Sequence, residues 1–340
     1  MNKLNNKFAI GCLVQWYEVD LVNEYIHSVY ESIKNIKNKE NVIVDICFNM
    51  GQNLEEIDEK QCKLTSIHDN FQKIAQELSD NNINTNVSFY PKELSNAFDK
   101  NLKPYTIADY RREFNDKYCE DVDILMWGET DALIPNKTFL ILDGLHDRVK
   151  SQHPKYLAFF STCKMWDDSW IPLEHPDFTD KPFMDKDYKN WWSHHYTMTI
   201  DEMNDINSKS DKNGYQVEVV NPFKFNGCGL IMSSDVIRGG ANIPKSVFFT
   251  HEDTAFCNLV RIMYGNKIPQ FVIKNVLLVH NRHNIEKRKY IKGENGDGST
   301  EMRNSSNWYK IAAEASQHNA HEFDMQVKLN KWEDVWKTIK

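Results

Sequence analysis

The sequence predicts an α/β protein built on a mainly parallel sheet with helices on both faces. Apolar segments of strand length alternate along the chain with longer segments whose apolar residues recur at helical spacing. The strand-like segments are apolar almost throughout rather than at every second position, which is typical of strands that are buried on both faces. The chain has 340 residues, enough for one large domain of this class or two smaller ones.

The first 126 residues predict four strands separated by three amphipathic helices. Val, Ile, Leu and Phe dominate the strand segments, and each helical segment places its apolar residues three or four positions apart. We expect strands at residues 8–14, 41–48, 87–90 and 122–126, and helices at 20–36, 67–78 and 106–118.

Two carboxylates follow the fourth of these strands. Glu129 and Asp131 are two positions apart, so in extended backbone both side chains would point to the same face. A hard divalent cation that bridges phosphates takes oxygen ligands of this kind. Gln15 and Asn49 also follow strands, and ligands of such sheets bind at the carboxyl ends of strands. We therefore expect a metal and ligand site here, the alternative being a solvated turn and ordinary loop polarity.

The second half continues with a strand at residues 156–162 and then changes in character. Residues 163–213 are rich in Trp, Asp, Lys and His, and no period of 2 or 3.6 persists through them. A long irregular insertion of this kind is typically a lid or a binding loop. Tryptophan beside carboxylates suits sugars, whose apolar ring faces stack on aromatic side chains, although a small satellite hydrophobic cluster is the alternative. The expected acceptor-binding residues are Trp166, Asp168, Trp170 and Trp192.

Three further motifs follow the insertion. The turn Gly227-Cys228-Gly229 leads into a strand, and its glycines would let the backbone approach a sugar closely. Thr250 is placed to cap a helix that begins with Glu252 and Asp253, and His280 follows a late apolar strand. Beyond a glycine-rich connector, two more helices are expected near residues 308–315 and 332–339, forming an extension over 293–340 that either covers residues 1–292 or binds a partner.

The order of these motifs resembles that of the GT-A glycosyltransferases. The resemblance spans residues 8–283 and depends on four short segments: Glu129-Thr130-Asp131, residues 225–232, 251–256 and 279–283. It implies a Rossmann-type sheet, a nucleotide-binding half at residues 1–135, an acceptor half at 136–292, and transfer of a sugar from a nucleotide-sugar, with UDP as the expected nucleotide. The acidic motif departs from the usual Asp-x-Asp of the family, since Glu129 occupies the first position.

The resemblance also implies roles for individual residues. Asp131 and Glu129 would hold Mn²⁺ or Mg²⁺ together with His280, which is favoured over His283, and a histidine ligand favours manganese. Asp253 would be the general base of an inverting displacement, with Glu252 orienting it or the acceptor. The residues expected to contact the donor are Gln15, Asn49, Arg111, Glu129, Asp131, Gly229 and Lys287.

Composition narrows the partners and the location. The net charge of −8 argues against broad binding of phosphate backbones, so a glycan or small hydroxylated acceptor is expected ahead of a hydroxylated DNA base. The basic run Lys287-Arg288-Lys289 keeps DNA as a second choice. No apolar run of about 18 residues is present, and the first residues lack the apolar core of a signal peptide. With seven cysteines and no Cys-x-x-Cys spacing, buried reduced thiols and a cytoplasmic location are expected.

Two other classes of function are compatible with parts of this pattern. A nucleotidyltransferase shares the parallel sheet and the acidic pair, but it generally needs a glycine-rich basic loop after the first strand, where this chain has Gln15-Trp16-Tyr17-Glu18. A non-catalytic sugar-binding module would use the tryptophans without the carboxylates. The sequence does not predict the sugar or the oligomeric state.

Overall fold

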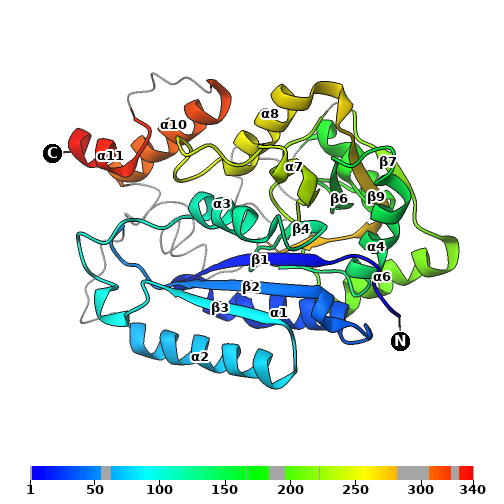
Figure 1. The fold of residues 1–340 in the computed structure, drawn as a ribbon, viewed down its shortest axis with the longest axis horizontal. Coiled ribbons are helices and arrows are strands. Elements are labelled where there is room, and N and C mark those ends of the chain that lie inside the picture. The colour runs from blue at the N-terminus through cyan, green and yellow to red at the C-terminus, as the bar shows by residue number, and fades with distance from the viewer. Residues whose placement is uncertain are drawn as a thin grey trace.

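The computed structural model describes residues 2–54, 63–165, 167–183, 196–221, 223–281, 306–322 and 329–339. Eight strands in these segments form one sheet in the order β3-β2-β1-β4-β8-β6-β9-β7, and two short strands form a second, β10-β5 (Figure 1). Four neighbouring pairs of the large sheet are parallel and three are antiparallel. The predicted class, an α/β fold with a mainly parallel sheet flanked by helices, is confirmed.

The first half matches the predicted alternation closely. Short 3₁₀ turns, η1 (Trp16–Glu18), η2 (Lys39–Asn41) and η3 (Leu94–Asn96), lie between its main elements. These elements are β1 (Phe8–Gln15), α1 (Val19–Ile33), β2 (Val42–Asn49), α2 (Leu64–Asp80), β3 (Thr85–Tyr90), α3 (Ile107–Tyr118) and β4 (Ile124–Trp127).

The second half closes the sheet with shorter strands and adds the C-terminal helices. Its strands are β5 (Ala132–Leu133), β6 (Leu157–Ser161), β7 (Val217–Val219), β8 (Ile231–Ser233), β9 (Gln270–Leu277) and β10 (Val279–His280). Its helices are α4 (Thr138–Val149), η4 (Asp168–Leu173), α5 (Pro176–Thr179), α6 (Ile200–Asn213), α7 (Ser234–Arg238), α8 (Glu252–Tyr264), η5 (Gly265–Lys267), α10 (Asn307–Glu322) and α11 (Trp332–Ile339).

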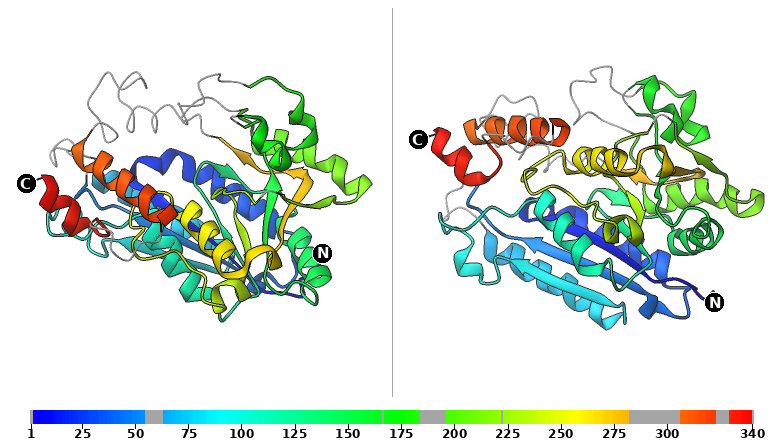
Figure 2. Two further views of the ribbon diagram at one scale, coloured as in Figure 1. Left: turned by 90° about the horizontal axis from the view of Figure 1, so that it is seen from above. Right: turned by 45° about the horizontal axis from the view of Figure 1, so that its top comes forward.

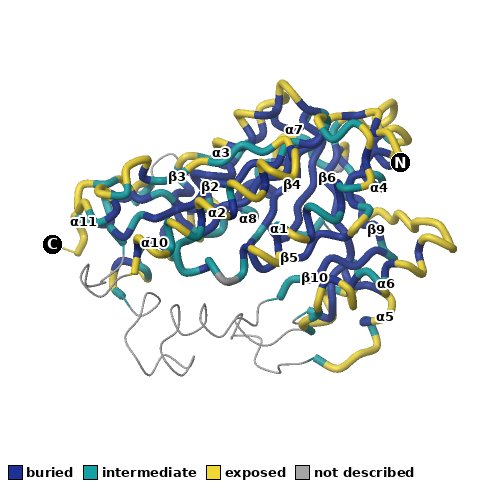
Figure 3. Tube along the Cα trace, turned by 90° about the horizontal axis from the view of Figure 1, so that it is seen from below, coloured by how far each residue is buried: buried dark blue, intermediate teal, exposed yellow. Residues whose placement is uncertain are grey.

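The alternating side chains of β1 build a core on each face of the sheet. Phe8, Ile10 and Val14 pack into the cluster that contains the apolar faces of α1, α2 and α4. Ala9 and Leu13 belong to the opposite cluster, with α3, α7 and α8. Both sets are buried because helices cover both faces, and the central strands β2, β4 and β6 are dark in the tube of Figure 3. A continuous apolar run in the sequence therefore corresponds to two distinct cores.

The expectation that residues 163–213 are irregular throughout is wrong. Residues 200–213 form α6, whose start is a capping box between Thr199 and Glu202. Its buried positions are Ile200, Met203, Asn207 and Ser210. These recur at helical spacing, but two of the four are polar, so apolar periodicity alone conceals the helix. The Asn207 side chain donates to the carbonyl of Leu277 at 2.9 Å and accepts from the amide of the same residue at 2.7 Å.

The C-terminal helices cover part of the large domain. α10 packs on α8, with Asn258 Nδ2 donating to the carbonyl of Ala320 at 3.0 Å (Figure 2). An aromatic cluster, which includes Phe248, Phe249, Trp308 and Trp332, joins both helices to the loop before α8.

Within the described segments, no helix is long and apolar enough to cross a membrane.

Candidate active site

A cavity of about 590 Å³ lies at the carboxyl ends of β1, β2 and β4. Its walls also include the start of α8, the turn before β8, and residues of α10. This is the edge at which parallel sheets bind ligands. Nine of the predicted site residues line it: Gln15, Asn49, Arg111, Glu129, Asp131, Trp170, Glu252, Asp253 and His280.

Two carboxylates and one imidazole converge on one side of this cavity. Nε2 of His280 lies 3.2 Å from Oε2 of Glu129 and 3.2 Å from Oδ1 of Asp131. The convergence depends on strand pairing, because β10 and β5 are antiparallel neighbours and His280 is opposite Ala132. The amide of Asn281 also donates to the carbonyl of Asp131 at 2.6 Å. Carboxylate and imidazole groups in this arrangement are suitable ligands for a divalent cation.

The backbone that brings Glu129 and Asp131 together is not the extended one that the sequence predicted. β4 ends at Trp127, and residues 130 and 131 form a turn before β5. The two carboxylates therefore share a face because the chain reverses toward β5, rather than because alternate strand residues point the same way. The amide of Gly128 donates to the carbonyl of Gly11 at 2.7 Å, which fixes the start of this turn on β1.

Arg111 of α3 connects this group to the start of α8. Its side chain is only 2% exposed, and its Nη2 and Nη1 lie 2.7 Å from Glu129 and 2.6 Å from Glu252. The guanidinium also lies over the ring of Trp127, 4.7 Å from its centroid. Arg112, by contrast, binds Asp109 and the backbone between residues 243 and 247. Arg111 thus lines the cavity, whereas Arg112 does not.

The charges around Arg111 shift the pKa values of its partners in opposite directions. Burial raises the pKa of Glu252 to about 7; Arg111 opposes this rise and the adjacent Asp253 adds to it. Although burial would also raise the pKa of Glu129, Arg111 and His280 outweigh it and lower that pKa. Burial would lower the pKa of Arg111, but Glu252 and Glu129 raise it. Glu129 and Arg111 are thus held as ions, whereas Glu252 can exchange a proton near neutral pH.

The start of α8 places Asp253 in the same cavity. The residue at the helix cap is His251, in the left-handed conformation with φ of 63°. Thr250 is not the cap, contrary to the prediction, and its hydroxyl has no hydrogen-bond partner among the described residues. The carboxylate of Asp253 accepts from the amide of Thr254 at 2.7 Å through Oδ1. Oδ2 faces Gly227, where an added Cβ would lie 3.1 Å from it.

In the Gly227-Cys228-Gly229 turn, each of the two positions requires glycine for a different structural reason. A Cβ on Gly227 would lie 2.8 Å from Nη1 of Arg111 and 3.0 Å from Cβ of Asp253. Any side chain at this position would therefore displace one of these two residues. Gly229 has φ of 66°, and a Cβ there would lie 2.5 Å from Leu278. Gly229 does not line the cavity, whereas Gly227 and Cys228 do. Of the two glycines, only Gly227 is placed where the predicted approach to a sugar could occur.

The remaining predicted residues occupy varied positions. Asn49 lines the cavity while its side chain donates to the carbonyl of Tyr105 at 2.8 Å and accepts from the amide of Gly51 at 3.1 Å. Trp170 lines the cavity, but Asp168 is outside the lining, with a side chain 81% exposed and 3.9 Å from Lys164. Four predicted residues lie outside the described part of the chain: Trp166, Trp192, His283 and Lys287.

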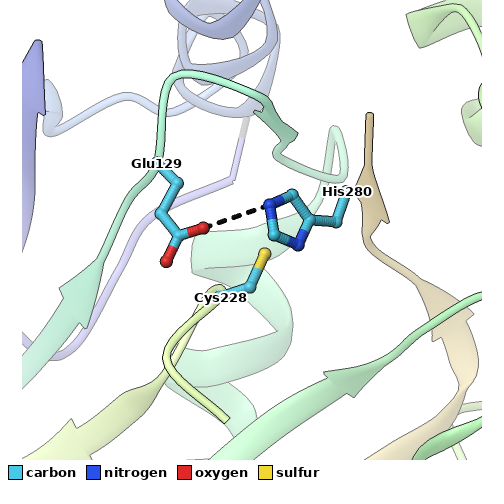
Figure 4. A group of neighbouring side chains, drawn as sticks. All are labelled: Glu129, Cys228 and His280. Carbon is cyan, nitrogen blue, oxygen red and sulfur yellow. Dashed lines mark ion pairs between the residues drawn. The ribbon is translucent and has the colours of Figure 1, made fainter. Parts of the chain in front are cut away.

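Among the lining residues that sequence reasoning did not place at the site are Cys228 and Tyr309. The sequence predicts Cys228 to be a buried thiol within a glycine turn but not a metal ligand, and its Sγ lies within 4.8 Å of ligand atoms of Glu129 and His280 (Figure 4). Its place between two glycines in the turn before a strand was the available signal. Tyr309 of α10 also lines the cavity, and no local pattern in the C-terminal extension indicates this.

Comparisons with known proteins yield similarity of structure alone. No family model matches the chain, and no curated protein matches it. Two solved structures of glucosyl-3-phosphoglycerate synthase from Mycobacterium tuberculosis are similar in structure to this chain, and each alignment covers 84% of its residues. One, in complex with Mg²⁺ and UDP, has 9% identity, a TM-score of 0.38 and 75% of its own chain covered. The other, with Mn²⁺, UDP and glucosyl-3-phosphoglycerate, has 10% identity, a TM-score of 0.39 and 76% covered. Similarity at this level does not assign a function, which must come from the residues of this chain.

Proposed function

We propose that this protein is a metal-dependent glycosyltransferase that moves a sugar from a nucleotide-sugar, with UDP as the nucleotide, to a hydroxyl acceptor. The observation that carries the proposal is the arrangement of one cavity. Glu129, Asp131 and His280 meet on one side of it, and Asp253 lies at the start of α8 on another. The two groups offer a cation site and a separate carboxylate, which are the two functions that sugar transfer requires.

The donor side fits a divalent cation. Glu129, Asp131 and His280 would hold it, and an imidazole among carboxylates favours Mn²⁺ over Mg²⁺. When bound, the metal would supply Lewis-acid stabilisation of a leaving diphosphate. Arg111 would keep Glu129 ionised and oriented, since it binds the carboxylate oxygen opposite the one that faces His280. Gln15 and Asn49, at the ends of β1 and β2, are the proposed contacts to the nucleoside.

The acceptor side would use Asp253 as the general base of an inverting displacement. One carboxylate oxygen of Asp253 is fixed by the amide of Thr254, and the other is directed toward Gly227 at the cavity wall. Accepting a proton from a hydroxyl requires a carboxylate within hydrogen-bond reach of it. Glu252 would position Arg111 rather than contact the acceptor, because its Oε1 binds that guanidinium.

The charge of the cavity favours a small hydroxylated acceptor or glycan over DNA. Its described lining contains five carboxylates, those of Glu18, Glu129, Asp131, Glu252 and Asp253, and one guanidinium, that of Arg111. A polyanion would be repelled by this balance. Trp170 and Phe225, which also line it, offer faces on which a sugar ring can stack. A hydroxylated DNA base remains the second choice, and binding that weakens steeply with salt would favour it.

Two other functions make different predictions for the same residues. A nucleotidyltransferase would act on a nucleoside triphosphate with a sugar phosphate, and the loop after β1, which forms η1 with Glu18, is neither basic nor rich in glycine. A sugar-binding module would tolerate substitution of Asp131 and Asp253.

A thermal-shift panel tests the proposal. UDP, GDP, CDP and ADP, and their sugars, would each be added with and without Mn²⁺. One nucleotide should raise the unfolding temperature by several degrees only with Mn²⁺, because ligand at 100 times its Kd stabilises by about 2.7 kcal/mol. Asp131→Asn should abolish the shift, whereas Asp205→Asn, an exposed position on α6 outside the cavity lining, should retain it. Folded protein that shifts with none of these nucleotides would rule out the transferase and favour the sugar-binding module.

A further inference from the structure

A cysteine thiol lies beside the candidate cation site. Sγ of Cys228, a carboxylate oxygen of Glu129 and a ring nitrogen of His280 all lie within 4.8 Å of one another. Figure 4 shows the three side chains converging from separate segments of the chain, with the sulfur directed toward the histidine ring. Oxygen ligands suffice for Mg²⁺ and Mn²⁺, so a thiol at this position changes the ions that the site can select.

Each of the three donors is held in place by separate contacts. The amide of Cys228 donates to Oδ1 of Asn226 at 3.1 Å, and the left-handed Gly229 that follows packs against Leu278. His280 is fixed by pairing of β10 with β5, and Glu129 by its ion pair with the buried Arg111. The cluster is therefore part of the ordered framework of the site, and Cys228 itself is buried, with 7% of its surface exposed.

We infer that Glu129, Cys228 and His280 form a three-ligand centre for a thiophilic divalent cation, with Zn²⁺ as the ion that it fits best. Zinc sites of this kind use three protein ligands and leave a fourth, open position. With ligand atoms at about 2.0–2.3 Å from zinc, neighbouring ligand atoms lie roughly 3.3–3.7 Å apart. The Glu129–His280 pair, at 3.2 Å, has nearly this spacing, and the sulfur needs a shift of about 1 Å at most.

The consequence for activity rests on the proposed function. Glu129 and His280 are also proposed ligands of Mn²⁺, so the two ions cannot occupy the site together. Zn²⁺ bound through a deprotonated thiol gains a soft ligand that Mg²⁺ and Mn²⁺ do not favour. Zn²⁺ thus displaces Mn²⁺, and Cys228 sets the metal preference of the site.

Absorption spectroscopy with Co²⁺, a spectroscopic substitute for Zn²⁺, tests the thiolate ligand directly. The wild-type protein should develop a near-ultraviolet thiolate-to-cobalt charge-transfer band on addition of one equivalent of Co²⁺, and Zn²⁺ should remove it. Cys228→Ser should lose the band. Cys163→Ser, a buried cysteine outside the cavity lining, should retain it. Wild-type protein without the band would overturn the inference, whether or not the serine variant folds.

Metal affinities separate this inference from the proposed function. Cys228→Ser should weaken Zn²⁺ binding at least about tenfold, because even outer-shell partners contribute 10–100-fold, and should change Mn²⁺ binding by less than about threefold. Equal loss of both ions would mean that Cys228 acts only by shaping the site, and would overturn the inference. The UDP and Mn²⁺ thermal shift is read independently. A cobalt band without the thermal shift would support the three-ligand centre and reject the transferase. A thermal shift without the cobalt band would support the transferase and reject the three-ligand centre.

Discussion

At the scale of single residues, Arg111 is the side chain on which the site depends. It is a buried cation between Glu129 on the metal side and Glu252 at the start of α8. Loss of Arg111 would be costly because the carboxylates of Glu129 and Glu252 would stay desolvated without a counter-charge. Arg111 therefore links the acidic turn after β4 to the start of α8 across the cavity.

The first residue-scale prediction concerns Asp253. Asp253→Asn should lower kcat by about 10²–10⁴-fold, the range expected for loss of a general base, and leave the affinity for nucleotide and Mn²⁺ within about threefold. The start of α8 should persist, since an asparagine oxygen can still accept from the amide of Thr254. Steady-state kinetics and thermal shift with UDP measure the two quantities. Transfer at a near wild-type rate in this variant would reject Asp253 as the base.

The second concerns the dependence of stability on pH through Glu252. Its pKa is about 7 in the folded protein against an ordinary 4.5, so the folded state retains the proton at pH values where the unfolded chain has lost it. Stability should therefore fall as pH rises from about 4.5 to about 7, by at most roughly 3 kcal/mol from this group.

Glu252→Gln removes that titration, and comparing the variant with the wild-type protein at low pH provides the control. At pH 4.5 the variant and the wild-type protein should have similar free energies of unfolding, and at pH 8 the variant should be the more stable. Urea denaturation without added metal or nucleotide measures both. A variant that is less stable at pH 8 than the wild-type protein would show that the ion pair with Arg111 outweighs burial.

At the scale of elements, the short antiparallel pairing of β5 with β10 and the strained start of α8 position the side chains of the cavity. β5 and β10 have two residues each, yet their register brings His280 to the acidic turn. α8 begins after His251 in a left-handed conformation, which most side chains disfavour and which recurs at functional sites. This start directs Glu252 toward Arg111 and Asp253 toward Gly227.

Substitutions at His251 measure how much the left-handed backbone at the start of α8 costs in stability. His251→Gly and His251→Ala both remove the imidazole, but only alanine keeps a Cβ at a φ of 63°. We expect the glycine variant to be the more stable by about 1–2 kcal/mol, as measured by chemical denaturation. Equal stabilities would mean that α8 begins in another conformation once the imidazole is absent.

At the scale of the whole molecule, the C-terminal helices complete the cavity. α10 packs on α8 and supplies Tyr309 and Ala313 to the lining. Trp332 of α11 secures this arrangement, with its ring centroid 5.4 Å from that of Phe248 and 5.8 Å from that of Trp308. The described helices of residues 293–340 thus pack on α8 and on the loop before it.

Trp332 offers a test of that cover. Trp332→Ala should destabilise the C-terminal helices by about 3–5 kcal/mol, make residues 306–339 sensitive to limited proteolysis, and weaken donor binding through the loss of Tyr309. Trp332→Phe should be nearly neutral, because the indole Nε1 is buried without a hydrogen-bond partner among the described residues. Donor affinity unchanged in the alanine variant, with the helices cleaved, would show that α10 contributes no binding.

The sequence by itself determined the class of fold and the chemical types at the site. Continuous apolar strands followed by amphipathic helices identified the sheet from β1 to β4, because burial on both faces leaves a local signature. Nine of the residues that line the cavity were also predicted as site residues, since polar side chains at strand ends are local features too. α6 was missed because its buried face includes Asn207 and Ser210, although the Thr199–Glu202 capping box was legible.

Only the tertiary structure decided which of these side chains meet. Cys228 and His280 are 52 positions apart, and both are far from Glu129 in the chain, yet strand pairing and a glycine turn bring them within 4.8 Å. Burial raises the pKa of Glu252, and no local pattern in the sequence reveals that this side chain is buried beside Arg111. The entry of α10 into the lining likewise depends on packing against α8. Long-range contacts of this kind leave no periodicity in the sequence, so the site's geometry follows from the fold rather than from its motifs.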